Sequence, residues 1–224
     1  MRIVLRIGGS IIGSPINVDL IKQYATLLKN LKAKGHEVAA VVGGGDLARE
    51  FITNARSLGL DEKAQDELAI SVSRVFAQLF LEKLEGMSCE AVPLTVDDAS
   101  KCLQKGKVAV MGGLKPGMTT DTVAALLAEK VNADLLIKAT NQEGVYDKDP
   151  KKHADAVKLD HISFEALSDV FTEDKHKAGI RQIIDPEAVK TLKRKRVKMI
   201  VVNGFKPENV LAAVRGERVG TVID

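Results

Sequence analysis

Cysteine, tryptophan and closely spaced histidines are scarce in this sequence, which excludes several kinds of metal and redox protein. Cys89 and Cys102 are the only cysteines, there is no tryptophan, and the four histidines are scattered without HExxH spacing. The cysteine spacing matches neither a zinc site nor a redox motif, so we expect two reduced thiols in the core and no disulfide. No residue is therefore predicted to bind a metal directly.

Long apolar runs and a strong excess of one charge are also missing. No apolar stretch approaches the roughly 20 residues of a membrane-spanning helix, and Met1 leads directly into an apparent strand without a signal-peptide pattern. We therefore expect a cytoplasmic protein with no membrane partner. The formal net charge of +3, with both signs interspersed, is too small for a nucleic-acid binder but is compatible with small anionic substrates. The basic run 193–196 fits the end of a helix better than a nucleic-acid patch.

The sequence does contain a regular alternation of strand and helix patterns. Its 224 residues, 45% hydrophobic and 28% charged, suit one globular domain with a sizeable core. Short β-branched runs predict buried strands over residues 3–7, 38–42, 108–111, 135–139 and 199–202. Because amphipathic helices separate these runs, the pattern predicts an α/β fold with a parallel sheet.

Four helices and one polar segment are predicted in more detail. The first helix covers residues 18–31 and ends near a glycine. The second covers residues 66–84 and is expected to turn these apolar residues toward the core: Leu68, Ile70, Val72, Val75, Phe76, Leu79 and Phe80. Two later helices are expected to begin at Pro186 and Pro207, because proline at the first helical position gives up only an unpaired amide. The polar stretch 141–156 predicts a long loop or a hairpin.

Glycine-rich or small polar turns follow three of the predicted strands and precede helices. These turns cover residues 8–10, 43–45 and 112–120. In an open parallel sheet, ligands bind beyond the carboxyl ends of the strands, where glycine lets the backbone approach phosphate and helix N-termini present unpaired N–H groups. A single such turn is more often a tight connection than a phosphate cradle. Three of them in one small sheet predict a site for two phosphate-bearing molecules.

Two common nucleotide motifs do not account for these glycines. No GxxxxGK[ST] sequence occurs, which excludes a P-loop enzyme. Gly43, Gly45 and Ala48 satisfy the GxGxx[GA] dinucleotide pattern, and Asp66 lies at about the expected distance downstream. Asp66 is expected to open a helix, whereas the ribose-binding acid of a dinucleotide site ends the next strand, so NAD binding is disfavoured.

Three longer segments resemble archaeal uridylate kinases, a branch of the amino-acid-kinase family. They are GGGDLARE (43–50), MGGLKPGMTTDTVAALLAE (111–129) and ATNQEGVYDKDPKK (139–152). The opening RIGGS and the closing ERVGTVI add weaker matches, so the resemblance covers essentially the whole chain. It implies a three-layer α/β/α sandwich with a central, mainly parallel sheet. It also implies a single domain over residues 1–224, with a UMP-binding lobe at about 1–130, an ATP-binding lobe at about 131–224, and assembly as a homohexamer.

The resemblance assigns roles to individual residues. Gly44, Asp66 and the loop after the third strand would surround UMP, with Asp66 accepting hydrogen bonds from the ribose hydroxyls. The loop residues are Leu114, Lys115, Pro116, Gly117, Met118, Thr119 and Thr120. ATP phosphates would lie near Gly9, Ser10, Gly45 and Arg49, and the ATP nucleoside near Thr140, Asn141, Tyr146 and Asp149. The catalytic candidates are Arg6, Arg49 and Asp121, and Mg²⁺ would accompany ATP.

Some positions depart from the archaeal pattern on the acceptor side and after the fourth strand. Leu114, Lys115 and Met118 stand where a threonine and two histidines are expected, and Gln142-Glu143 replaces a Val-Asp pair. Lys115 is either a cation beside the UMP phosphate or an exposed loop lysine.

Other matches leave their role open. Asp121 either organises cationic side chains around the transferring phosphoryl group or caps a helix. Arg6 stands where many relatives carry lysine, and Lys177 matches the family without an assignable role.

The implied reaction transfers the γ-phosphoryl group of MgATP to UMP and gives UDP and ADP for pyrimidine nucleotide biosynthesis. Isopentenyl phosphate, acetylglutamate and carbamate kinases of the same fold are alternatives. The first is disfavoured because it resembles an HGGGSFGH pattern, whereas this chain has VGGGDLARE at 42–50. A sensor that binds nucleotides without transferring phosphate is a further alternative, against which Arg49, Asp66 and Asp121 argue.

Overall fold

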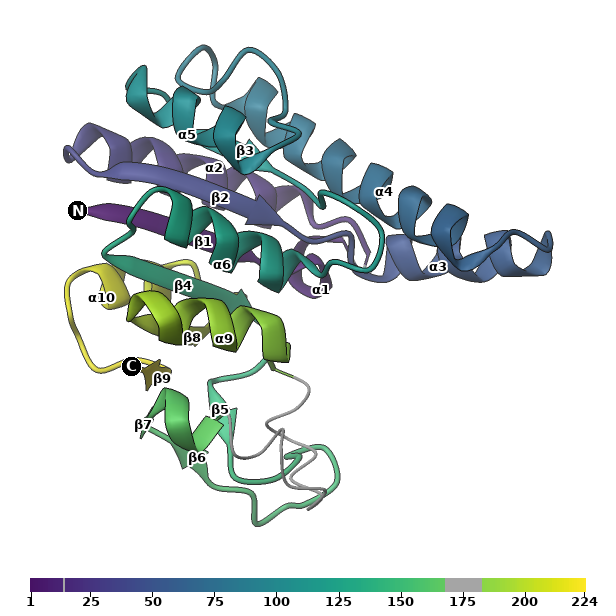
Figure 1. The fold of residues 1–224 in the computed structure, drawn as a ribbon. Coiled ribbons are helices and arrows are strands. Elements are labelled where there is room, and N and C mark those ends of the chain that lie inside the picture. The colour runs from purple at the N-terminus through teal and green to yellow at the C-terminus, as the bar shows by residue number, and fades with distance from the viewer. Residues whose placement is uncertain (14, 168–182) are drawn as a thin grey trace.

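A computed structural model describes residues 1–13, 15–167 and 183–224, and within them the chain forms a seven-stranded sheet between helices (Figure 1). Five neighbouring strands are parallel: β3 (Ala109–Met111), β2 (Glu37–Val42), β1 (Arg2–Ile7), β4 (Leu135–Thr140) and β8 (Met199–Asn203). β9 (Thr221–Ile223) runs antiparallel to β8, and β7 (His161–Ile162) pairs with β9 at the edge of the sheet. The five predicted strands and the mainly parallel sheet are confirmed.

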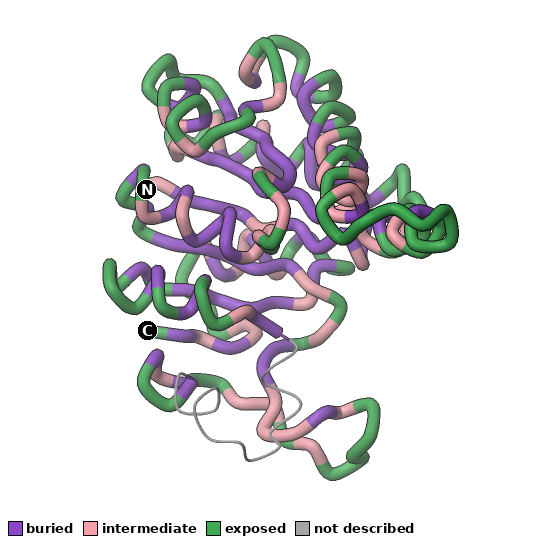
Figure 2. The backbone as a smooth tube through the Cα atoms, turned by 45° about the vertical axis from the view of Figure 1, so that its right-hand side comes forward, coloured by how far each residue is buried: buried purple, intermediate pink, exposed green. Residues whose placement is uncertain are grey.

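The central strands are apolar on both sides, so both faces of the sheet are buried. In β1, Ile3, Leu5 and Ile7 belong to the core on one face, and Val4 belongs to the core on the other. The continuous purple backbone through the middle of Figure 2 shows this burial. The same alternation places Arg6 on the face of Val4, at the carboxyl end of the strand.

Helices cover both faces and make the fold a three-layer sandwich, as predicted. The Ile3 face packs against α1 (Gly9–Ile12), α2 (Val18–Ala33), α4 (Glu62–Lys83) and α10 (Glu208–Val214). The Val4 face packs against α5 (Val96–Gln104), α6 (Thr120–Lys130) and α9 (Pro186–Lys195). α3 (Gly45–Ser57) lies beside α4, and the two helices project beyond the sheet (Figure 1).

The structure corrects two predicted helix boundaries. Asp61 accepts a hydrogen bond from the Ala64 amide at 2.8 Å, so α4 begins at Glu62 rather than at Asp66. Asp66 therefore lies in the second turn of α4 and does not open the helix. α10 begins at Glu208, one residue later than predicted, and Pro207 is its N-cap residue. α9 does begin at Pro186, and its basic end is confirmed.

The buried face of α4 is narrower than the sequence pattern predicts. Val72, Phe76 and Phe80 recur every four residues and are buried against the sheet. Val75 and Leu79 lie at the margin of this buried stripe and are 61% and 44% exposed. Their prediction as core residues is wrong.

The polar stretch after β4 forms a hairpin, one of the two predicted outcomes. β5 (Val145–Tyr146) pairs antiparallel with β6 (Lys158–Leu159). In Figure 1 this small hairpin lies at the lower end of the molecule, beside β7 at the edge of the main sheet.

The two cysteines form a disulfide, so the prediction of reduced thiols is wrong. The chain after α4 returns along the edge of the sheet, where the Cys89 amide donates to the Val108 carbonyl at 3.2 Å. This brings Cys89 beside α5, and its Cα lies 5.7 Å from that of Cys102. Spacing along the sequence gave no indication of this approach.

A membrane-spanning segment is absent from the part of the chain that the structure describes. None of its helices combines the necessary length with sufficient apolar character.

Candidate active site

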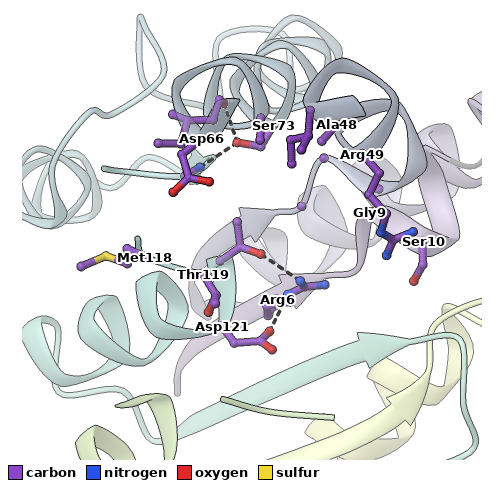
Figure 3. Close-up of a pocket in the computed structure, with 18 of the residues that line it drawn as sticks. Arg6, Gly9, Ser10, Ala48, Arg49, Asp66, Ser73, Met118, Thr119 and Asp121 are labelled. Atoms are coloured by element: carbon purple, nitrogen blue, oxygen red, sulfur yellow. Dashed lines mark hydrogen bonds and ion pairs between the residues drawn. The ribbon is translucent and has the colours of Figure 1, made fainter. Parts of the chain in front are cut away.

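The three glycine-rich turns meet at one cavity of about 710 Å³ at the carboxyl ends of β1, β2, β3 and β4. Figure 3 shows the cavity between the loops and α4. It is lined by Gly9 and Ser10 after β1, by Gly43, Gly44 and Gly45 after β2, by residues of the loop after β3, and by Thr140 and Asn141 after β4. The predicted convergence of the turns is confirmed.

Glycine is required where the first two turns touch. A Cβ added to Gly9 would lie 2.0 Å from the Gly45 nitrogen and 2.7 Å from the Gly43 carbonyl carbon. Gly45 itself has φ of 63°, a conformation that side chains rarely adopt. The two backbones therefore lie in contact, and α3 begins at this point, so its first amides are close to the cavity.

Two cations and one carboxylate form the floor of the cavity. Arg6 on β1 and Lys138 on β4 are register partners in adjacent parallel strands. Asp121, in the first turn of α6, lies between them: its Oδ1 is 2.8 Å from Arg6 Nε, and its Oδ2 accepts a hydrogen bond from Lys138 Nζ. Arg6 also donates to the Thr120 hydroxyl at 2.8 Å (Figure 3).

Burial and charge act against each other in this cluster. The side chains of Arg6, Asp121 and Lys138 are 15%, 14% and 6% exposed. Burial alone would raise the pKa of Asp121, but the charges of Lys138 and Arg6 outweigh it and hold that pKa below its ordinary value. Burial lowers the pKa of Lys138, and Asp121 offsets only part of that effect. Lys138 also donates to the Ile183 carbonyl.

Asp121 is not the cap of its helix. The Thr119 hydroxyl caps α6 by accepting from the Thr122 amide at 3.1 Å. Arg6 Nε and Asp121 Oδ1 form a close ion pair without an aligned hydrogen bond, and neither atom has another hydrogen-bond partner among the described residues. Of the two roles that the sequence left open for Asp121, the geometry supports the organisation of cations.

The loop after β3 forms the wall that faces α4. Five of its predicted UMP-binding residues line the cavity, namely Lys115, Gly117, Met118, Thr119 and Thr120, as do Gly44 and Asp66. Asp66 Oδ2 accepts a hydrogen bond from the Gly117 amide at 2.7 Å. Leu114 and Pro116 belong to the same loop but do not line the cavity.

On the opposite side, the cavity contains most of the residues predicted to bind ATP. Gly9, Ser10, Gly45, Arg49, Thr140 and Asn141 all line it. Arg49 pairs with Asp46 on the same helix, and its side chain is 68% exposed. Tyr146 lies in β5 and Asp149 follows it, and neither residue lines the cavity. Asp149 accepts a hydrogen bond from the Lys151 amide at 3.0 Å. Lys177 lies outside the described residues.

Sequence reasoning assigned no role to two polar residues that line the cavity. Lys138 was counted as part of an apolar strand, although a charged residue inside the run LLIKAT must find a buried partner and so carried a signal. Ser73 on α4 lines the cavity and accepts from the Gly113 amide at 2.8 Å. No pattern in the sequence distinguishes it from other serines.

A model of the amino acid kinase family matches residues 1–203. Uridylate kinase from Methanocaldococcus jannaschii is 44% identical over 226 aligned residues that cover all of both chains. Uridylate kinase from Natronomonas pharaonis is 41% identical, covering 100% of this chain and 98% of the relative. The crystal structure of uridylate kinase from Archaeoglobus fulgidus superposes with a TM-score of 0.90 at 39% identity, with both chains covered completely. UMP kinase from Bacillus anthracis shares the fold, with a TM-score of 0.83 at 20% identity and coverage of 100% and 95%.

Proposed function

The chain belongs to the amino acid kinase family, and from this membership and its cavity we infer that it is a uridylate kinase. It transfers the γ-phosphoryl group of ATP to UMP and releases UDP and ADP. The observation that carries this function is the meeting of three glycine-rich turns above the Arg6–Asp121–Lys138 cluster, in a chain whose full-length relatives are uridylate kinases. The other kinases of this fold are not favoured.

The reaction is an in-line displacement at the γ-phosphorus of ATP. A phosphate oxygen of UMP forms the new bond, and the bond between the γ-phosphorus and the oxygen that bridges it to the β-phosphate breaks, leaving ADP. The attacking oxygen is already anionic, so no strong general base is required. Catalysis depends instead on holding two polyanions in line while fixed positive groups offset their charge.

The cation cluster is suited to this task. Asp121 holds Arg6 and Lys138 in fixed positions beside the cavity, so the two cations need little reorganisation when phosphate arrives. The Asp121 carboxylate is acceptor-only and already faces two cations, which supports a positioning role rather than proton transfer.

We propose that the two substrates approach from opposite sides of this cluster. UMP would bind to the lobe at 1–130 through Gly44, Asp66 and the loop after β3, and ATP would bind to the lobe at 131–224 through Thr140, Asn141, Tyr146 and Asp149. The turns around Gly9, Ser10 and Gly45, together with Arg49, would hold the ATP phosphates between them. The turns, Arg49, Thr140 and Asn141 line the same cavity as Asp66 and the loop after β3, which supports this arrangement.

We also propose Mg²⁺ as the cofactor that accompanies ATP. Among the described residues, no group of three or more His, Cys, Asp or Glu side chains is placed to hold a metal ion. Mg²⁺ commonly keeps several waters and binds substrate phosphates, so a site without a protein cage fits it. When bound, the ion would neutralise charge that develops on the β- and γ-phosphates.

We propose that the chain assembles as a homohexamer. We also propose that it works in the cytoplasm, where ATP and UMP are available for pyrimidine nucleotide biosynthesis. Large apolar side chains exposed around α3 and α4 support self-association: Phe51, Leu58, Leu60, Val75 and Leu79. Light scattering of the purified protein should give six times the mass of the chain. A mass of one chain at working concentrations would contradict the assembly.

A screen of phosphate acceptors tests the activity. Release of ADP from MgATP should be measured in a coupled assay with UMP, CMP, isopentenyl phosphate, acetylglutamate and carbamate in turn. We expect UMP to give the highest kcat/KM. Faster turnover with isopentenyl phosphate, acetylglutamate or carbamate would reassign the chain within its family, and binding of ATP and UMP without turnover would indicate a sensor.

A further inference from the structure

Arg74 on α4 binds two backbone carbonyls of the loop after β3. Its Nε donates to the Gly113 carbonyl at 3.1 Å, and its Nη2 donates to the Leu114 carbonyl at 3.1 Å. Arg74 is half-buried and does not line the cavity, whereas Gly113, Lys115 and residues 117–120 of the loop do. We propose that Arg74 is a positioning residue for UMP that acts through the backbone of this loop. The inference rests on the proposed uridylate kinase activity.

The contacts of Arg74 have a direct consequence for an anionic ligand. Carbonyl oxygens carry partial negative charge, so a loop that binds phosphate must keep them out of its cavity. The guanidinium engages two consecutive carbonyls, those of Gly113 and Leu114, and so fixes their direction toward α4. Without Arg74, these two carbonyls lose this side-chain donor and can rotate toward the UMP phosphate.

Neighbouring contacts show that α4 holds this loop at several points. Ser73 Oγ accepts from the Gly113 amide at 2.8 Å, and Asp66 Oδ2 accepts from the Gly117 amide at 2.7 Å. A Cβ on Gly112 would lie 2.7 Å from Ser73 Oγ and 2.8 Å from the Arg74 nitrogen, so the loop backbone lies directly against the helix. Ser73 and Asp66 hold amides, and Arg74 holds the carbonyls between them.

The chemistry favours arginine over lysine at this position. A planar guanidinium presents several N–H donors in a fixed fork, and it reaches two acceptors at once without losing its charge. A lysine ammonium on a flexible stem can contact one carbonyl but does not fix the relative direction of two. The conservative substitution should therefore restore only part of the function.

Steady-state kinetics of Arg74→Ala and Arg74→Lys test the inference, with UMP varied at saturating MgATP and MgATP varied at saturating UMP. Arg56→Ala is the matched control, because Arg56 is exposed in the last turn of α3. Losing two hydrogen bonds from a charged donor should raise the KM for UMP by about tenfold or more in Arg74→Ala, with an intermediate rise in Arg74→Lys. The KM for ATP should change by less than about twofold in both variants, and Arg56→Ala should match the wild type.

Two results would overturn the inference. One is a KM for UMP within about twofold of the wild-type value in both variants, a change smaller than one lost hydrogen bond produces. The other is an equal rise in the KM values for UMP and ATP, which would indicate a general structural role. If Arg74→Ala does not fold, Arg74→Lys alone is compared by the same criteria. A wild-type enzyme that phosphorylates UMP, together with unaffected variants, rejects the role of Arg74 and leaves the proposed function standing; an inactive wild type rejects the function itself.

Discussion

Arg6 and Lys138 lie side by side on neighbouring parallel strands, and Asp121 of α6 forms an ion pair with each of them. Two like charges at paired positions of a buried sheet repel each other, and burial makes each more costly. The carboxylate from α6 offsets part of this cost. The arrangement leaves a net positive charge facing the cavity, which suits a site where two phosphorylated substrates meet.

Lys138→Met should retain the shape of the buried stem and remove its charge. We expect kcat to fall by about 10²-fold or more, the usual scale for losing one preorganised charge at a reacting centre. Circular dichroism of the variant provides the control for folding. A folded variant with kcat within about threefold of wild type would show that Lys138 has no part in phosphoryl transfer.

Asp66→Asn should chiefly weaken the binding of UMP. The amide oxygen can still accept from the Gly117 amide, so the loop keeps its hydrogen bond while the carboxylate charge that we propose for ribose binding is lost. We expect the KM for UMP to rise by about tenfold with little change in the KM for ATP. A fall in kcat at unchanged UMP affinity would contradict the assignment of Asp66 to the ribose.

Acid should destabilise the protein partly through Asp121. Its pKa in the folded state lies below the ordinary value of 3.8, so its contribution to stability is present above 3.8 and is lost as the pH falls through the folded pKa. The free energy of unfolding, measured by urea titration between pH 5 and pH 2 at about half-unit steps, should fall less steeply in Asp121→Asn than in the wild type. Parallel curves would show that Asp121 is not ionised and paired in the folded state.

Reduction of the Cys89–Cys102 disulfide should lower stability. The bond closes a short loop, with a sequence separation of 13 residues, and constrains the unfolded chain. Chain entropy predicts a loss of about 3 kcal/mol in the free energy of unfolding when the bond is reduced. A variant with both cysteines replaced by serine should not respond to reductant. Identical wild-type stability with and without reductant would mean that the bond is not formed in solution.

Much of the scaffold was predictable because local patterns determine it. The five parallel strands are short β-branched runs, and glycine must occupy positions such as Gly9, where two backbones touch. Helix starts were less predictable. The cap of α4 is Asp61, which lies outside the apolar period of the helix, so the sequence pattern places the start of the helix four residues too late.

What the sequence could not reveal depends on contacts between distant segments. Lys138 becomes a site residue only because the register of β1 and β4 places it beside Arg6. The disulfide depends on how the chain folds back after α4, and the role of Arg74 depends on how closely the β3 loop approaches the same helix. Lys138 carried a signal as a charge inside an apolar strand, but its neighbour Arg6, the disulfide and the contacts of Arg74 leave no periodic signal in the chain.

A bisubstrate analogue, with adenosine and uridine joined through five phosphates, tests most directly whether the two nucleotides meet end to end at the glycine-rich turns. Inhibition of UDP formation should be measured against varied ATP and, separately, against varied UMP. We expect inhibition competitive with both substrates, because one molecule would fill both subsites and span the Arg6–Asp121–Lys138 cluster. Inhibition competitive with only one substrate, or none at all, would contradict a shared cavity for the two phosphates.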